Sequence, residues 1–222
     1  MAKLTIEAKD GHRLGAYMAS PTGTSKGGVV VLQEIFGVNA HIRDVCDRFA
    51  AQGYHAVAPA LYDRSSLRDA ELDYTKDDVQ RGRALREEFS WDDTMLDVHA
   101  AIDELSKNVE KVATVGFCWG GTIAFLSATR LPVAGAVVYY GGQIVPYVEE
   151  RAKAPLLMHF GSRDASIPPE MIDQIRNAHP QAAIHVYDAD HGFNCDRRGS
   201  HDETAASLAG KRTLAFFEDV LS

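Results

Sequence analysis

The sequence predicts one α/β domain in which a mostly parallel, doubly wound sheet is flanked by helices. Apolar segments such as residues 27–37 and 111–117 lack the polar alternation of a half-exposed strand, so both of their faces are expected to be covered. These segments alternate with stretches of helical periodicity, an order that gives right-handed parallel connections. The 222 residues contain no linker, repeat or low-complexity tract, which favours a single domain over residues 1–222.

Six apolar segments are expected to form the parallel part of the sheet. In chain order they are residues 27–37, 54–62, 111–117, 133–141, 154–161 and 182–189. The first 20 residues are expected to add an antiparallel hairpin at one edge. In such a sheet, ligands bind beyond the carboxyl ends of the strands, so residues at those ends are the first candidates for function.

The helices are expected between these strands. They are residues 40–53, a segment that follows Ser90–Asp93, about 119–130, 168–179 and about 203–221. The first has an apolar stripe that includes Cys46, which is therefore expected in the core, and Gly53 is a stop signal at its end. Ser90 and Asp93 form a capping-box pattern at the start of the second.

Composition and charge limit the classes of molecule that the protein is expected to bind. The formal net charge is −8, and an acidic field repels the phosphates of nucleic acids and anionic membranes. No apolar run has the length of a signal peptide or a membrane span, so a soluble, cytoplasmic protein that acts on small molecules is expected. Three cysteines without CxxC spacing indicate neither a disulfide framework nor a zinc site. Neither a dinucleotide nor a P-loop motif is present, and no cofactor or metal is predicted.

A cysteine stands where strand 111–117 turns into a helix. Residues Gly116-Phe117-Cys118-Trp119-Gly120 have the G-x-C-x-G form of a nucleophile elbow, a turn so tight that β-carbons at 116 and 120 would crowd it. Gly121 is expected to let the helix approach its neighbours closely. The helix N-terminus favours a thiolate and a developing oxyanion. The alternative is that Cys118 is a small apolar residue of the core.

A general base and a residue to orient it follow Cys118 in the chain. Asp164 comes after strand 154–161 and His191 after the last strand, so both are expected at the same sheet edge as the cysteine. Asp188 and Asp190 also neighbour His191, but adjacent side chains of an extended segment diverge. The remaining histidines are expected on the surface or as satisfied core residues: His12, His41, His55, His99, His159, His179, His185 and His201.

The motifs LQEIFG, GFCWGG, GSRDASIP and DADHGFN resemble those of the dienelactone hydrolase family over essentially the whole chain. This resemblance implies an α/β-hydrolase fold without a lid domain, as a monomer or small homo-oligomer that binds a small ester or lactone. It implies that Cys118 is the nucleophile, that His191 is the general base and then acid, and that Asp164 orients it. Glu34 matches the family's glutamate beside the resting thiol.

The resemblance also implies a substrate-activated mechanism. An anionic substrate is expected to displace Glu34, which then takes the thiol proton, because an anionic Glu34 nearby keeps the thiol protonated. Attack on an ester or enol lactone carbonyl gives a thioester, with the oxyanion bound by the N–H groups of Trp119 and Ile35.

The predicted substrate pocket departs from the family pattern. A serine and an arginine that grip the substrate carboxylate are replaced by Gly192 and by Cys195, which is expected in a loop and exposed. Arginines elsewhere are candidates for this cation, and aromatic residues are expected to rim the pocket. The arginines are Arg81, Arg83, Arg86, Arg197 and Arg198, and the aromatic residues are Phe36, Trp119, Tyr139 and Tyr140. A metal held by Cys195 with His191 and His201 is disfavoured, because no ligand spacing supports it.

Two other classes remain open. Amidotransferase-like and deglycase-like proteins also place a cysteine on an elbow, but their glutamine-hydrolysing members have His-x-Glu where this chain has His191-Gly192-Phe193. A non-catalytic ligand or redox sensor could use Cys118 as a switch, although such a protein has no need of Asp164.

Overall fold

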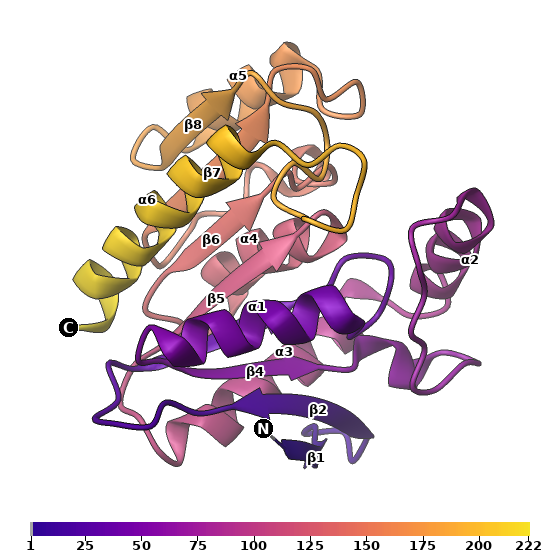
Figure 1. Ribbon diagram of the computed structural model, residues 1–222, viewed down its shortest axis with the longest axis vertical. Coiled ribbons are helices and arrows are strands. Elements are labelled where there is room, and N and C mark those ends of the chain that lie inside the picture. Colours follow the sequence, from indigo (N-terminus) through magenta and orange to yellow (C-terminus); the bar gives the residue numbers. More distant parts are fainter. Residues whose placement is uncertain (1) are drawn as a thin grey trace.

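A computed structural model describes residues 2–222 (Figure 1). Eight strands form one sheet in the order β1-β2-β4-β3-β5-β6-β7-β8. Their bounds are β1 Ala2–Glu7, β2 Arg13–Ala19, β3 Gly28–Leu32, β4 His55–Pro59, β5 Val112–Phe117, β6 Ala136–Tyr139, β7 Leu156–Gly161 and β8 Ala183–Tyr187. The expected hairpin is present: β1 pairs with β2 in antiparallel register, β2 pairs antiparallel with β4, and the strands from β4 to β8 are parallel.

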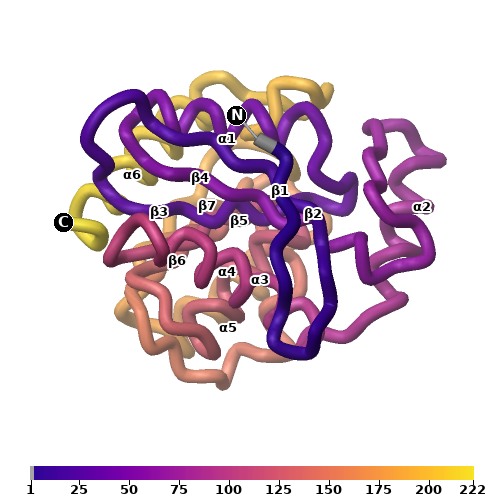
Figure 2. The backbone as a smooth tube through the Cα atoms, turned by 90° about the horizontal axis from the view of Figure 1, so that it is seen from below, coloured from indigo at the N-terminus to yellow at the C-terminus, as the bar shows by residue number. Residues whose placement is uncertain are grey.

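The helices cover both faces of the sheet. They are α1 Ala40–Ala51, α2 Lys76–Arg86, α3 Trp91–Ser106, α4 Trp119–Arg130, α5 Pro169–Ala178 and α6 Glu203–Leu221, with short 3-10 helices η1 Leu61–Arg64 and η2 Val145–Tyr147. Figure 2 shows α1 and α6 on one side of the sheet and α3, α4 and α5 on the other. The strands β3 and β5 are buried along their whole length, which confirms the doubly wound α/β prediction.

Local signals position these helices. The capping box predicted at α3 is present, because Ser90 Oγ accepts from the Asp93 N–H and the Asp93 carboxylate accepts from the Ser90 N–H. Asn39 caps α1 by accepting from the Ile42 N–H. Helix α2 lies within the segment whose arginines the sequence marked as candidates, and Figure 2 shows it set apart from the layers of the sheet.

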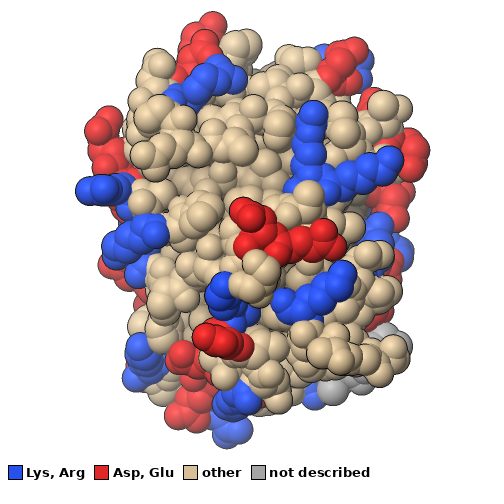
Figure 3. Space-filling view, turned by 90° about the vertical axis from the view of Figure 1, so that its left-hand side faces the viewer, with Lys and Arg blue, Asp and Glu red and all other residues tan. Residues whose placement is uncertain are grey.

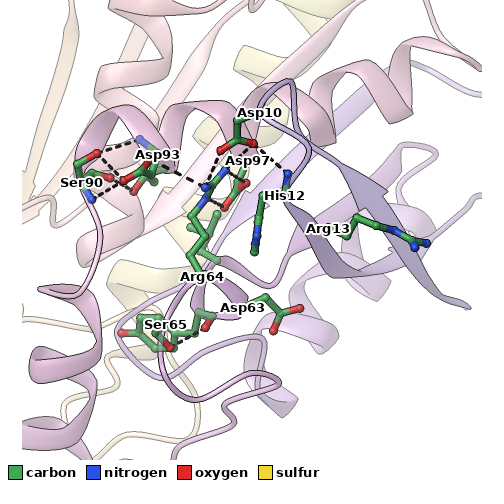
Figure 4. A network of polar contacts seen from close by, with 12 residues as sticks. Asp10, His12, Arg13, Asp63, Arg64, Ser65, Ser90, Asp93 and Asp97 are labelled. Carbon is green, nitrogen blue, oxygen red and sulfur yellow. Dashed lines mark hydrogen bonds and ion pairs between the residues drawn. The ribbon is translucent and has the colours of Figure 1, made fainter.

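A buried ion-pair network ties the amino-terminal hairpin to the body of the sheet. Arg64 of η1 donates to both oxygens of Asp97 on α3, at 2.7 and 2.8 Å, and to both oxygens of Asp10 in the hairpin turn (Figure 4). Asp97 is fully buried. A buried carboxylate is tolerated here because a guanidinium meets it with two parallel hydrogen bonds.

The carboxyl ends of the parallel strands lie at the edge nearest α2 in Figure 1. Figure 3 shows the opposite edge, where acidic and basic side chains are mixed rather than separated into areas of one sign. Within residues 2–222, no helix combines the length and apolar character that a membrane span requires.

Candidate active site

Cys118 lies on a strained turn between β5 and α4. Its backbone has φ 56° and ψ −116°, a left-handed conformation that L residues rarely adopt. A β-carbon on Gly116 would lie 1.8 Å from the Gly120 carbonyl oxygen, and one on Gly120 would lie 2.3 Å from the Leu32 carbonyl oxygen. The glycines are therefore required, the first by the turn itself and the second by the approach of α4 to the end of β3. This is the geometry predicted for a nucleophile elbow.

His191 is held in the loop after β8 by the carboxylate of Asp164. The Nδ1 atom of His191 lies 2.6 Å from Asp164 Oδ2. The other carboxylate oxygen accepts from the Ser166 N–H at 2.9 Å and from the Ser166 hydroxyl. Burial alone would raise the pKa of Asp164, but the hydrogen bonds from His191 and Ser166 lower it below its usual value. Asp164 is therefore ionised and fixed toward the imidazole.

Cys118 and His191 meet in a cavity of about 290 Å³. Burial lowers the pKa of His191, but the charge of Cys118, the hydrogen bonds that the ring donates to Asp164 and Cys118, and the charge of Asp164 outweigh burial and raise this pKa to about 10. The imidazole is thus held by a carboxylate and lines the same cavity as the Cys118 sulfur. This arrangement favours the protonated form of the ring.

Glu34 follows β3 and is fully buried. Its Oε1 accepts from Arg198 Nη1 at 3.1 Å, and its Oε2 accepts from the Tyr74 hydroxyl at 3.2 Å. The guanidinium carbon of Arg198 lies 5.9 Å from the ring centroid of Phe36 and 5.7 Å from that of Tyr74. The carboxylate is therefore paired with a cation that faces the same cavity as Cys118.

Arg198 occupies the space that Gly192 leaves open. A β-carbon on Gly192 would lie 2.7 Å from both Cζ and Nη1 of Arg198. Cys195, which the sequence led us to expect as exposed, is fully buried, and its thiol donates to the Tyr74 hydroxyl at 3.2 Å. The departures at Gly192 and Cys195 are thus linked. The arginine expected at position 195 is absent, and Arg198, three residues further along the same loop, fills the space beside Gly192.

The two residues whose N–H groups are expected to bind the oxyanion lie at this cavity. Ile35 and Trp119 both line it. Trp119 is the first residue of α4, so its N–H has no partner within the helix. The Ile35 N–H donates to no acceptor among residues 2–222. Free donors in this position suit the role of an oxyanion hole.

Some of the residues predicted to contact substrate line the cavity, and others do not. Phe36, Trp119, Arg83, Arg86 and Arg198 line the cavity. Arg81 is exposed and does not. On α2, residues 79, 83 and 86 share one face, and position 81 points elsewhere.

Both tyrosines at the end of β6 are also absent from the cavity lining. Tyr139 is buried, and its hydroxyl lies 2.7 Å from the Thr213 hydroxyl, beside a separate cavity of about 440 Å³. Tyr140 is fully buried, with its ring centroid 5.0 Å from that of His191 and 5.3 Å from that of Phe193. Direct contact of either tyrosine with substrate stays a prediction.

Sequence reasoning missed Ser166 and Tyr74. The Asp-x-Ser order at 164–166 is a signal for a turn in which the serine N–H donates to the aspartate, and this turn does form. No comparable signal marks Tyr74, because it lies in an irregular segment between η1 and α2.

Comparisons with known proteins identify the family of this chain. The model of the dienelactone hydrolase family matches residues 14–221. Carboxymethylenebutenolidases of Pseudomonas putida and Pseudomonas knackmussii are each 34% identical over 230 residues, which cover 99% of this chain and 97% of theirs. A crystal structure described as "Putative Dienelactone Hydrolase from Klebsiella pneumoniae" has a TM-score of 0.84 and 31% identity, and the match covers 97% of both chains. This chain therefore belongs to the dienelactone hydrolase family.

Proposed function

We propose that this protein hydrolyses small carboxylic esters or lactones through a thioester formed on Cys118. The observation that carries the proposal is the position of the His191 ring, which lies 2.6 Å from Asp164 and lines the same cavity as Cys118. A sensor that only binds a ligand has no need of a histidine held by a carboxylate beside a cysteine. Acyl transfer, in contrast, requires a group that accepts a proton and later returns it.

The first half of the reaction uses Glu34 as base and His191 as acid. Glu34, once a substrate has released it from Arg198, takes the Cys118 proton, and the sulfur attacks the carbonyl carbon of the substrate. The oxyanion accepts hydrogen bonds from the Ile35 and Trp119 N–H groups, each of which contributes about 3 kcal/mol of barrier reduction. The carbon–oxygen bond then breaks, the leaving alkoxide takes the proton from His191, and a thioester remains on Cys118.

The second half releases the acid. Water attacks the thioester carbonyl while its proton passes to His191. The carbon–sulfur bond breaks, and the thiolate leaves with the imidazolium restored beside it. Because a thiolate leaves more readily than an amine, amide substrates tend to return to reactant, and activated esters or enol lactones fit this site better.

The charges that line the cavity favour an anionic substrate. Arg83, Arg86 and Arg198 line it, and no acidic side chain of residues 2–222 does. Arg198 is held by Glu34, so a substrate carboxylate competes with Glu34 for the guanidinium. In this proposal, a released Glu34 is free to accept the Cys118 proton, which couples substrate binding to formation of the nucleophile.

A slow aryl ester followed by intact-protein mass spectrometry tests the proposal. We expect an acyl adduct on Cys118, and loss of both adduct and turnover in Cys118→Ala. Cys46→Ala is the matched control, because Cys46 is buried on α1. Hydrolysis that survives in Cys118→Ala would reject the covalent mechanism, and hydrolysis that survives in His191→Ala would reject the assigned base.

A further inference from the structure

A second cluster of reactive side chains lies behind the proposed catalytic centre. Glu34, His41 and Cys195 each place one ligand atom within 4.8 Å of the other two. They come from the end of β3, the first turn of α1 and the loop after β8. All three are fully buried. Ligands so far apart in the sequence are brought together only by the fold, which is why no ligand spacing was visible in the sequence.

His41 is the unexplained member of this cluster. The sequence led us to expect a surface or satisfied core histidine, and this expectation was wrong: neither ring nitrogen has a hydrogen-bond partner among the described residues. Nδ1 lies 3.5 Å from Asp196 Oδ1, which is too long for a hydrogen bond of normal strength. A buried polar group without a partner costs about 1–3 kcal/mol, so its retention calls for a ligand or a partner.

The chemistry of the three ligand atoms selects the type of metal. A thiolate sulfur, an imidazole nitrogen and a carboxylate oxygen are the ligands of Zn²⁺, with bonds of about 2.0–2.3 Å in a tetrahedron. Mg²⁺ and Ca²⁺ prefer oxygen ligands alone.

We propose that Glu34, His41 and Cys195 form a binding site for Zn²⁺ or a similar borderline-soft divalent ion. The ligand atoms move closer by side-chain rotation, and the fourth position falls to water or to the Tyr74 hydroxyl, which already contacts both Glu34 and Cys195. His41 binds through Nε2, and its Nδ1–H donates to Asp196, which is the usual outer partner of a metal-bound histidine.

Binding of the metal ion changes the charge of Cys195 and the partner of Glu34. Cys195 loses its proton to solvent, so one thiolate and one carboxylate neutralise the dication. Glu34 then leaves Arg198. If Glu34 has the role given to it under the proposed function, a bound ion prevents it from accepting the Cys118 proton and the enzyme is inhibited. This consequence rests on the proposed function, whereas the binding itself does not.

The binding experiment uses full-length protein carrying Cys118→Ser, which removes the partly exposed Cys118 thiol as an alternative ligand. Zn²⁺ affinity is measured by competition with a chromogenic chelator, and stoichiometry by metal analysis after gel filtration. We expect one Zn²⁺ per chain, a loss of affinity of about a hundredfold or more when His41→Gln or Cys195→Ser is added, and no effect of His201→Gln as a surface control. Mg²⁺ at the same concentration is expected not to compete. Co²⁺ in place of Zn²⁺ should give a thiolate charge-transfer absorption that Cys195→Ser removes.

Three results would overturn the site. They are an absence of Zn²⁺ binding, binding that requires Cys118, and binding unchanged in both His41→Gln and Cys195→Ser. Thermal unfolding of each variant without metal shows whether it is folded, and two independent variants keep the test decisive if one is not. Zinc inhibition of the wild-type esterase is the second measurement. Binding without inhibition would leave the site in place and reject the role of Glu34.

Discussion

Gly192 and Arg198 fit together as a pair. The space that a β-carbon would take at Gly192 is filled by the guanidinium group of Arg198, at 2.7 Å from its Cζ. The same guanidinium holds Glu34 and faces the cavity that contains Cys118. The absence of a side chain at position 192 is therefore what allows the Arg198 guanidinium to face the cavity.

Gly192→Ser is expected to displace Arg198 from the cavity. A hydrogen bond to a charged group contributes about 1.5–3 kcal/mol, so kcat/KM for an ester with a free carboxylate should fall by about ten- to a hundredfold. The corresponding neutral methyl ester should be hydrolysed at nearly the wild-type rate. Gly192 has φ 80°, so backbone strain is controlled by Gly11→Ala, at φ 83° with open space around it. Equal losses for both esters would show that Arg198 does not read the carboxylate.

The Arg64 network leads to a prediction for stability. Arg64→Met leaves Asp97 buried without its cation, and breaking such a pair from one side costs about 3–5 kcal/mol. We therefore expect a large fall in the free energy of unfolding measured with urea, and recovery of most of it in the double variant Arg64→Met, Asp97→Leu. Arg13→Ala is the surface control, because its pair with Glu7 is largely exposed and should contribute under about 1 kcal/mol. A double variant no more stable than Arg64→Met would contradict this account.

The parts of the fold that local chemistry dictates were predictable from the sequence. The capping box at Ser90 and Asp93, the glycines around Cys118 and the apolar strands each carry their own physical signal, and each forms as expected. Asp164 and His191 were also predictable, because parallel strands deliver their carboxyl ends to one edge. Whether the other predicted residues face the cavity depends on the direction of their side chains, which the order of strands and helices does not determine.

The direction of each side chain explains why some residues predicted at the substrate pocket do not line the cavity. Tyr140 has φ 40°, which turns the chain at the end of β6 and directs the ring toward the core, and no sequence pattern indicates such a turn. Arg81 and Arg83 lie two residues apart on one helix, and only the phase of that helix decides which reaches the cavity. Arg198 lies in an irregular loop, where no periodicity fixes the direction of a side chain.

The pKa of His191 leads to a pH prediction. Its value of about 10 lies above the ordinary value near 6.5, so the protonated ring is favoured at neutral pH. Acylation requires this proton for the leaving alkoxide, and kcat/KM should therefore fall only as the pH rises through about 10. The stability that the raised pKa provides is present below pH 6.5 and is lost between there and pH 10. A pH profile of kcat/KM measures the first effect, and urea unfolding at a series of pH values measures the second.

Asp164→Asn is expected to move that alkaline limit. The variant removes a charge that raises the pKa of His191, so the fall in kcat/KM should begin at lower pH, and its maximum should drop by about a thousandfold because the ring is no longer held in the correct tautomer. Ser166→Ala removes a smaller hydrogen-bond contribution to the same carboxylate and should shift the profile less. An Asp164→Asn profile that coincides with that of the wild type would exclude Asp164 as the partner of His191.

Alkylation of Cys118 by iodoacetamide without substrate tests the pairing of Glu34 with Arg198. Glu34→Gln removes a negative charge near the sulfur and should increase the second-order rate several-fold. Arg198→Gln removes the cation and leaves Glu34 uncompensated, so the rate should decrease. Because both variants break the same ion pair of 3.1 Å, a purely structural role for the pair would change both rates in one direction. Opposite changes, with a rate near that of the wild type in the double variant, would show that the two charges act on the nucleophile through each other. Mass spectrometry of the modified protein assigns the alkylation to Cys118 rather than Cys195.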